Sequence, residues 1–261
     1  MNSHQIEYKI YGDDMQFVEV ELDPQETVVA EAGSLMMMED GIGMETIFGD
    51  GSGGGGLMGK LFNAGKRVLT GESLFMTTFT NQAYGKKHVS FASPYPGKII
   101  PMDLSQLGGK IICQKDAFLA AAKGVTVGIE FQRKIGTGFF GGEGFIMQKL
   151  EGDGLTFVHA GGTIHKKELL PGEVLRVDTG CLVAMTSSVN YDIEMVKGIK
   201  TALFGGEGLF FATLRGPGTV WVQSLPFSRL ASRVFAAMPS RGGHSDEGSI
   251  ARGIFNLLDG D

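Results

Sequence analysis

Residues 141–145 read Gly-Gly-Glu-Gly-Phe, and residues 205–209 read Gly-Gly-Glu-Gly-Leu. Each stretch continues through apolar residues to a glycine turn, at Gly152 and at Gly216, and then through a second apolar run. Two apolar runs joined by a tight glycine turn are typical of a β-hairpin. A weaker third copy, Gly-Glu-Ser-Leu-Phe, occupies residues 71–75. The pattern predicts a strand-rich unit that occurs three times.

A second motif lies upstream of each glycine motif. Residues 21–26 read Glu-Leu-Asp-Pro-Gln-Glu, and residues 168–173 read Glu-Leu-Leu-Pro-Gly-Glu. The apolar runs that follow, 27–35 and 174–182, also match. In the middle copy we assign the equivalent run to residues 111–119, after Gly-Gly-Lys.

The spacing between the two motifs is nearly constant. It is 33 residues from Lys110 to Glu143 and 34 residues from Glu173 to Glu207. In the first copy it is 46 residues, and a glycine-rich segment at 49–60 accounts for the extra length. We therefore interpret 49–60 as an insertion in the first copy.

These patterns predict an all-β fold of three tandem β-sandwich repeats in a pseudo-threefold arrangement. Apolar residues at helical spacing from Phe227 to Phe235 indicate a C-terminal amphipathic helix. We also expect a short helix before each Gly-Glu strand, at residues 61–69, 132–140 and 197–204.

The repeats suggest four divisions of the chain. An opening hairpin from Tyr8 to Leu22 and the first repeat make up 1–98. The remaining divisions are repeat 2 at 99–164, repeat 3 at 165–226, and a C-terminal helix with a mobile tail at 227–261.

Composition narrows the classes of function. Glycine supplies 41 of 261 residues, as many tight turns require, and the net charge is −6. An acidic chain makes nucleic acid an unlikely partner, since phosphate binding normally needs a basic face. No apolar run is long enough for a membrane helix, and we expect no signal peptide. With only Cys113 and Cys181, a disulfide framework is excluded and we expect a cytoplasmic protein.

The candidate site residues are the three repeat glutamates Glu72, Glu143 and Glu207. Threefold symmetry would bring their carboxylates together, where they could bind a cation through oxygen ligands. The alternative, which we favour, is that each accepts hydrogen bonds from backbone N–H groups at its turn. No motif supplies a catalytic set, a metal site or a cofactor site, so we expect a protein that is not an enzyme. We interpret Met36-Met37-Met38 as filler of the core or of an interface.

Several motifs together carry a family resemblance. They are the Gly-Glu-Ser-Leu-Phe stretch at 71–75, the two Phe-Gly-Gly-Glu-Gly copies at 140–144 and 204–208, and Trp-Val-Gln-Ser-Leu-Pro at 221–226. The chain resembles, over roughly Ile6 to Pro239, the bacterial family related to the fungal "altered inheritance of mitochondria" protein. The resemblance implies a triplicated fold similar to the subunit of the tryptophan RNA-binding attenuation protein, and a symmetric homo-oligomer. It implies no defined activity.

The resulting hypothesis is a non-enzymatic oligomeric scaffold or binding protein of the cytoplasm, whose protein partner is unknown. Apolar residues beside glycines at 139–140 and 203–204, with the C-terminal helix, favour a homo-oligomer, either a trimer or a hexamer. One alternative is a module that binds RNA or a small ligand, by analogy of fold alone. Another is an enzyme that uses the repeat glutamates. The last is peripheral membrane association through residues 57–69.

Overall fold

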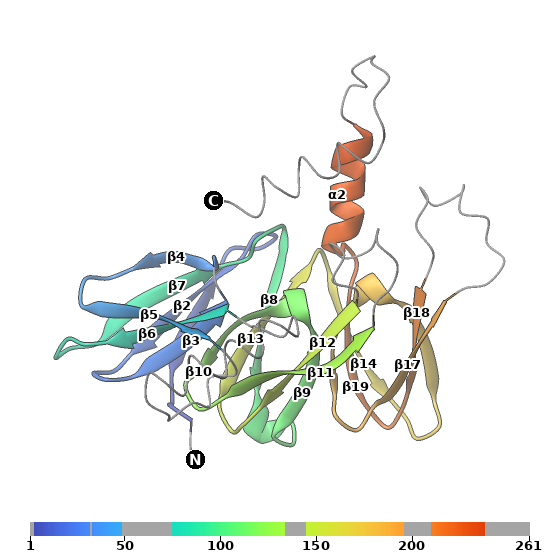
Figure 1. The fold of residues 1–261 in the computed structure, drawn as a ribbon, viewed down its shortest axis with the longest axis horizontal. Coiled ribbons are helices and arrows are strands. Elements are labelled where there is room, and N and C mark those ends of the chain that lie inside the picture. The colour runs from blue at the N-terminus through green and yellow to red at the C-terminus, as the bar shows by residue number, and fades with distance from the viewer. Residues whose placement is uncertain (1–2, 32, 49–74, 134–144, 196–209, 238–261) are drawn as a thin grey trace.

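A computed structural model describes residues 3–31, 33–48, 75–133, 145–195 and 210–237. These residues form mostly β strands, and the strands make four antiparallel sheets, here named A to D (Figure 1). The all-β prediction is therefore confirmed.

The strands of each sheet are given in their order across the sheet. Sheet A contains β1 (Glu7–Tyr11), β2 (Phe17–Leu22), β7 (Lys87–Ala92) and β4 (Leu35–Met38). Sheet B contains β5 (Ile42–Phe48), β6 (Phe75–Asn81), β3 (Thr27–Glu31), β10 (Phe118–Ala122), β13 (Leu155–Gly161) and β8 (Gly97–Asp103). Sheet C contains β11 (Thr126–Arg133), β12 (Phe145–Glu151), β9 (Lys110–Gln114), β16 (Leu182–Thr186), β19 (Gly218–Gln223) and β14 (Ile164–Leu169). Sheet D contains β15 (Val174–Asp178), β18 (Phe210–Arg215) and β17 (Asn190–Met195).

One rule describes the strand order of all four sheets. Adding six to every strand number converts the order of sheet B, β5-β6-β3-β10-β13-β8, into the order of sheet C. The same step relates β2-β7-β4 of sheet A to one half of sheet B, and β11-β12-β9 of sheet C to sheet D. We call β2–β7 segment 1, β8–β13 segment 2 and β14–β19 segment 3. Each six-stranded sheet thus combines strands of two consecutive segments, while the pseudo-threefold relation among the segments stays a prediction.

Three apolar cores lie between successive sheets. Core 1 joins sheets A and B, core 2 joins B and C, and core 3 joins C and D. Because side chains alternate across a strand, one strand serves two cores: Val28 and Ala30 lie in core 1, whereas Val29 lies in core 2. Sheets B and C are therefore apolar on both faces.

Consecutive segments are joined by direct strand pairing, at two seams. In sheet B, β10 pairs with β3 and Ala120 lies opposite Ala30. In sheet C, β16 pairs with β9 and Ala184 lies opposite Cys113. All four of these side chains are fully buried.

The glycine turns do not close hairpins, which corrects the sequence-based prediction. The strands before and after Gly152, β12 and β13, lie in sheets C and B, and those around Gly216 lie in sheets D and C. Each turn therefore carries the chain from one sheet of a sandwich to the other. A tight turn between two apolar runs fits either geometry, and the strands pair instead with partners far away in the sequence.

The alignment of the middle repeat is also corrected, by one residue. The strand-pairing register places Thr27, Lys110 and Val174 at equivalent positions, opposite Thr80, Glu151 and Arg215, respectively. The stretch equivalent to 27–35 is thus 110–118, not 111–119. A shift of one residue reverses the face on which each side chain lies.

The match between residues 21–26 and 168–173 has a local cause. The Glu26 carboxylate accepts a hydrogen bond from the backbone N–H of Asp23, at 2.9 Å. The Glu173 carboxylate accepts the same bond from Leu170, at 3.0 Å. Both glutamates therefore stabilise the turn that leads into the next strand.

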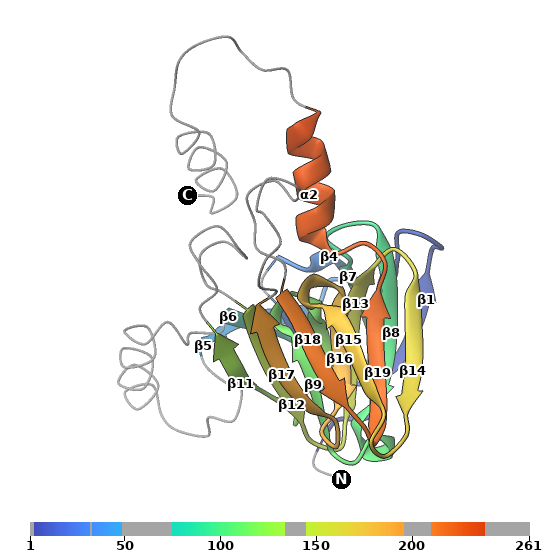
Figure 2. The same ribbon diagram turned by 90° about the vertical axis from the view of Figure 1, so that its right-hand side faces the viewer.

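Other expectations have mixed outcomes. The opening hairpin is confirmed as β1 paired with β2, and the C-terminal helix as α2 (Phe227–Ala236), which projects from the strand ends (Figures 1 and 2). The described one-turn 3₁₀ helices, Leu104–Gln106, Lys115–Ala117 and Thr179–Cys181, lie elsewhere than expected. Two residues of the helix expected at 132–140, Gln132 and Arg133, belong to β11, and its other residues from 134 on lie outside the described part, as do 61–69 and 197–204.

The expected division of the chain stays a prediction. Strand β8 begins at Gly97, two residues before the expected start of the second repeat, and β14 begins at Ile164, one residue before that of the third. Within the described residues, no helix has the length and apolar character needed to cross a membrane.

Candidate functional site

The candidate glutamates Glu72, Glu143 and Glu207 lie outside the described residues, as do the whole glycine-rich segment 49–60 and residues 57–69. The structure therefore neither brings these carboxylates together nor separates them. Among the residues that it describes, no three His, Cys, Asp or Glu side chains are grouped to hold a metal ion.

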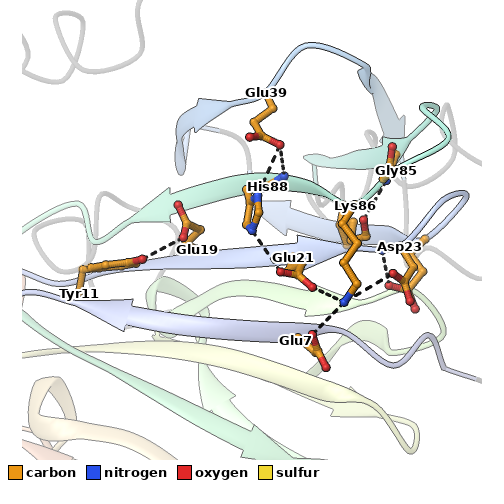
Figure 3. Close-up of polar contacts among 12 residues, drawn as sticks. Glu7, Tyr11, Glu19, Glu21, Asp23, Glu39, Gly85, Lys86 and His88 are labelled. Atoms are coloured by element: carbon orange, nitrogen blue, oxygen red, sulfur yellow. Dashed lines mark hydrogen bonds and ion pairs between the residues drawn. The ribbon is translucent and has the colours of Figure 1, made fainter.

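The structure instead brings together polar side chains on the outer face of sheet A (Figure 3). On β2, Val18 and Val20 are buried in core 1, so the alternating Glu19 and Glu21 point away from it. The hydroxyl of Tyr11 on β1 donates a hydrogen bond to Glu19, at 3.0 Å.

Lys86, just before β7, is the centre of this face. Its Nζ donates a hydrogen bond to Glu7, at 3.2 Å, and a closer one to Glu21, and it lies 3.8 Å from Asp23. The hydrogen bond to Glu21 is the main cause of a raised pKa for Lys86, and it lowers the pKa of Glu21 in turn. Because these groups are largely exposed, solvent screens their ion pairs, which contribute little to stability.

His88 on β7 continues the polar row toward β4. Its Nε2 lies 3.3 Å from a Glu21 oxygen and its Nδ1 lies 3.4 Å from Glu39. The backbone N–H of His88 also donates to Glu39, at 2.9 Å, and this bond lowers the pKa of the Glu39 carboxyl. The imidazole therefore bridges the carboxylate of Glu21 on β2 and that of Glu39, which directly follows β4.

Two shallow hollows lie along this face. One of about 420 Å³ is lined by carboxylates and Lys86, and one of about 390 Å³ lies between β2, β7 and β4. Carboxylates predominate in the first hollow and supply two of the six lining residues of the second, so the face attracts basic groups and repels anions such as phosphate. The lining residues of the second hollow are Glu19, Met37, Met38, Glu39, His88 and Ser90.

The second hollow exists because segment 1 has a small side chain where the other segments have an aromatic ring. Ser90 lies opposite Met37 of β4, Phe157 lies opposite Ala120 of β10, and Trp221 lies opposite Ala184 of β16. Phe157 and Trp221 are both buried against the preceding segment, in core 1 and core 2. In segment 1 the equivalent residue, Ser90, is also buried, and it lines the second hollow.

A separate group of titratable side chains lies near the seam between β3 and β10. Burial, followed by the charge of Asp116, raises the pKa of the half-buried Glu31 to about 7. Burial raises the pKa of Tyr95 to about 12 and lowers that of His159 to about 4. The Tyr95 and His159 rings meet edge to face, with centroids 4.4 Å apart. The neutral forms of all three side chains are thus favoured, as is typical of a packed junction rather than a charged binding site.

Neither the polar outer face of sheet A nor the group around Glu31 is predicted from the sequence. The alternation of Glu19 and Glu21 with valines indicates a polar strand face, so this signal was present. The group around Glu31 had no signal, because it joins residues that are distant in the sequence. The methionine run at 36–38 is not core filler within the chain, since each of its side chains is 42–47% exposed.

Comparisons with known proteins extend these findings. The family model described as mitochondrial biogenesis AIM24 matches residues 8–225. An uncharacterized protein of Streptococcus pyogenes serotype M6 is 31% identical over 231 residues, which cover 87% of this chain and 89% of that protein. The crystal structure of protein SPYM3_0169 from Streptococcus pyogenes is similar with a TM-score of 0.70 and 24% identity, over 90% of this chain and 100% of that one. The structural likeness shows the fold alone.

Proposed function

The chain belongs to the mitochondrial biogenesis AIM24 family, and on this premise we propose that it is a non-enzymatic homo-oligomeric scaffold or binding protein of the cytoplasm. Three tandem β-sandwich repeats are its proposed building plan, supported by the strand order that recurs with a step of six. The two cysteines are free thiols, as a reducing compartment requires.

Exposed apolar surface on β4 is the observation that carries the proposal. Leu35, Met36, Met37 and Met38 are consecutive, and each side chain is 36–47% exposed. An edge strand with four exposed apolar residues is a typical site at which another chain associates. Helix α2 adds a second apolar surface, with Phe227, Val234 and Phe235 each more than 40% exposed.

The charges on the outer face of sheet A indicate which class of partner this face favours. Its outer face carries Glu7, Glu19, Glu21 and Glu39 around Lys86 (Figure 3), and another lysine there, Lys9 on β1, lies opposite Glu19. Because carboxylates repel phosphates, this face favours a protein partner with basic groups over RNA.

Light scattering at micromolar concentration tests the oligomer. We expect a mass that is a multiple of 27.9 kDa, with a trimer or a hexamer favoured. Replacement of an exposed β4 residue, Met37→Lys, should lower this mass, while Met44→Lys on the exposed face of β5 serves as the matched control. A monomeric mass for the unmodified protein would refute the proposal.

A further inference from the structure

The strand pairing at the two seams inside the chain indicates which strand partners the first and the last segment lack. Strand β3 of segment 1 pairs with β10 of segment 2, and β9 of segment 2 pairs with β16 of segment 3. Extended by one step, this pattern pairs β15 of segment 3 with a strand of a following segment. That strand would be the equivalent of β4, β10 and β16. Among the described residues, β15 pairs only with β18, and β4 pairs only with β7.

The residues of β4 and β15 are more exposed than those of the equivalent strands in the other segments. All residues of β10 are buried, and all but Thr186 of β16, whereas every residue of β4 is exposed. Strand β3 is buried apart from Glu31, whereas β15 is only half-buried or exposed along its length. The open edges of β4 and β15 are therefore seam surfaces that lack their other half.

Within the part of the chain that the structure describes, one copy does not close this seam by itself. Sheet A and sheet D lie at opposite ends of the longest axis of the molecule, with β4 at one end and β17 and β18 at the other (Figure 1). The view onto the second end shows β15 beside β17 and β18 (Figure 2). A second copy of the chain carries the strand that the rule pairs with each edge: β4 for β15, and β15 for β4.

From this topology we infer that copies of the chain join head to tail, with β15 of one copy paired antiparallel to β4 of the next. The inference deepens the proposed oligomer, on which it rests, by naming the strands that join. Sheet D and the next copy's sheet A then form one sheet with the order β17-β18-β15-β4-β7-β2-β1, whose first six strands follow the order of sheets B and C. Such an interface is heterologous, so it closes a ring when the rotation per copy permits and otherwise builds a filament.

The register of the new seam follows from the internal ones. Ala30 opposite Ala120 and Cys113 opposite Ala184 are equivalent pairs, and their counterpart is Val177 opposite Met37 of the next copy. The next pair along the strands is Arg176 opposite Met38, beside Glu39, so a cation meets an acidic turn.

The surroundings of β4 agree with this register. Met37 lines the hollow of about 390 Å³ that Ser90 leaves open on sheet A. At the internal seams, the equivalent space is filled by Phe157 and Trp221, which pack against the preceding segment. The hollow thus provides room for side chains of the preceding copy. Strands β8 and β14 also have open edges in the described residues; their equivalent in segment 1, β2, pairs there with β1, which belongs to none of the three segments.

Disulfide trapping tests the register directly. Two proteins are prepared in a Cys181→Ser background, one with Val177→Cys and the other with Met37→Cys. Directly opposite residues of antiparallel strands have Cα atoms about 4.5–5.5 Å apart, within the range that a disulfide spans. We expect the oxidised mixture to yield a covalent dimer, and either protein alone to yield none.

The matched control moves one cysteine by a single residue, to Met38→Cys. Its side chain points to the other face, so we expect at least about tenfold less covalent dimer. Because β4 is exposed in the single chain, Met37→Cys and Met38→Cys should leave the circular dichroism spectrum and the unfolding temperature unchanged.

The outcomes separate the inference from the proposed function. An oligomeric mass with no trapped dimer would overturn the β15–β4 seam and leave the oligomer standing. Trapping of Val177→Cys with itself would mean a symmetric dimer and would also overturn the seam. A monomeric mass for the unmodified protein would overturn both.

Discussion

Glu31 is the residue whose environment departs furthest from that of an ordinary carboxyl group. Its pKa of about 7 in the folded protein, against the ordinary 4.5, means that the folded state holds a proton that the unfolded state releases. The favourable contribution is present below pH 4.5 and is lost as the pH rises to about 7. After allowance for solvent screening, the loss is on the order of 1–2 kcal/mol. We predict that Glu31→Gln, which stays neutral, gains that much stability relative to wild type between about pH 5 and pH 8.

Urea denaturation at the two pH values measures this difference. Glu45→Gln on β5 of the same sheet is the control, because that side chain is exposed. The groups that face Glu31 are Asp116 and Lys115, whose charges act in opposite directions. An equal pH response of the wild type and Glu31→Gln would contradict the prediction.

At the same scale, the sequence predicts local contacts and misses distant ones. The bonds of Glu26 to Asp23 and of Glu173 to Leu170 span three residues, and they appear in the sequence as a matched motif. The influence of Asp116 on Glu31 joins two strand ends across a seam, which no short pattern encodes.

The turn between β6 and β7 is held by a side chain, unlike its equivalents. Asn81 is fully buried, and its amide donates to the carbonyls of Leu22 and Gly85, both at 2.8 Å. Its Oδ1 accepts from the N–H of Ala83, at 2.9 Å. We predict that Asn81→Ala lowers the free energy of unfolding by about 2–4 kcal/mol, because buried backbone groups lose their partners.

Chemical denaturation of two further variants tests the cause. Asn81→Asp keeps the acceptor and removes the donors, so it should also destabilise the protein. Asn190→Ala, on the exposed position of β17, should change stability by less than about 0.5 kcal/mol. If Asn81→Ala proves as mild as Asn190→Ala, the side chain does not hold the turn.

Which elements form could be predicted from the sequence, whereas their partners could not. Glycine turns and apolar alternation indicated the strands around Gly152 and Gly216. Those turns were interpreted as hairpins, yet each connects two sheets. The actual partners, such as Ala30 and Ala120, are 90 residues apart, and only their packing in shared cores selects them.

The shared sheets make the whole molecule a single cooperative structure. Each six-stranded sheet contains strands of two segments, and its two faces line two cores. The single tryptophan, Trp221, lies in core 2, whereas Phe91 is fully buried in core 1. We predict that Phe91→Ala lowers the free energy of unfolding, as measured by Trp221 fluorescence, by about 3–5 kcal/mol. This effect is expected although the two residues lie in different cores.

Fluorescence and far-ultraviolet circular dichroism should give one coincident unfolding transition for wild type and variant. Tyr84→Ala is the control, since that ring is fully exposed. A tryptophan transition unmoved by Phe91→Ala would mean that the segments unfold independently.

Cys113, fully buried opposite Ala184 at the seam of sheet C, has a consequence for how the protein can be observed over time. Burial raises the pKa of its thiol to about 12, so the folded protein holds almost no reactive thiolate there. The thiol reacts with an alkylating reagent only during the moments when β9 and β16 part. In a Cys181→Ser background, the rate at which Cys113 is labelled therefore measures how often that seam opens.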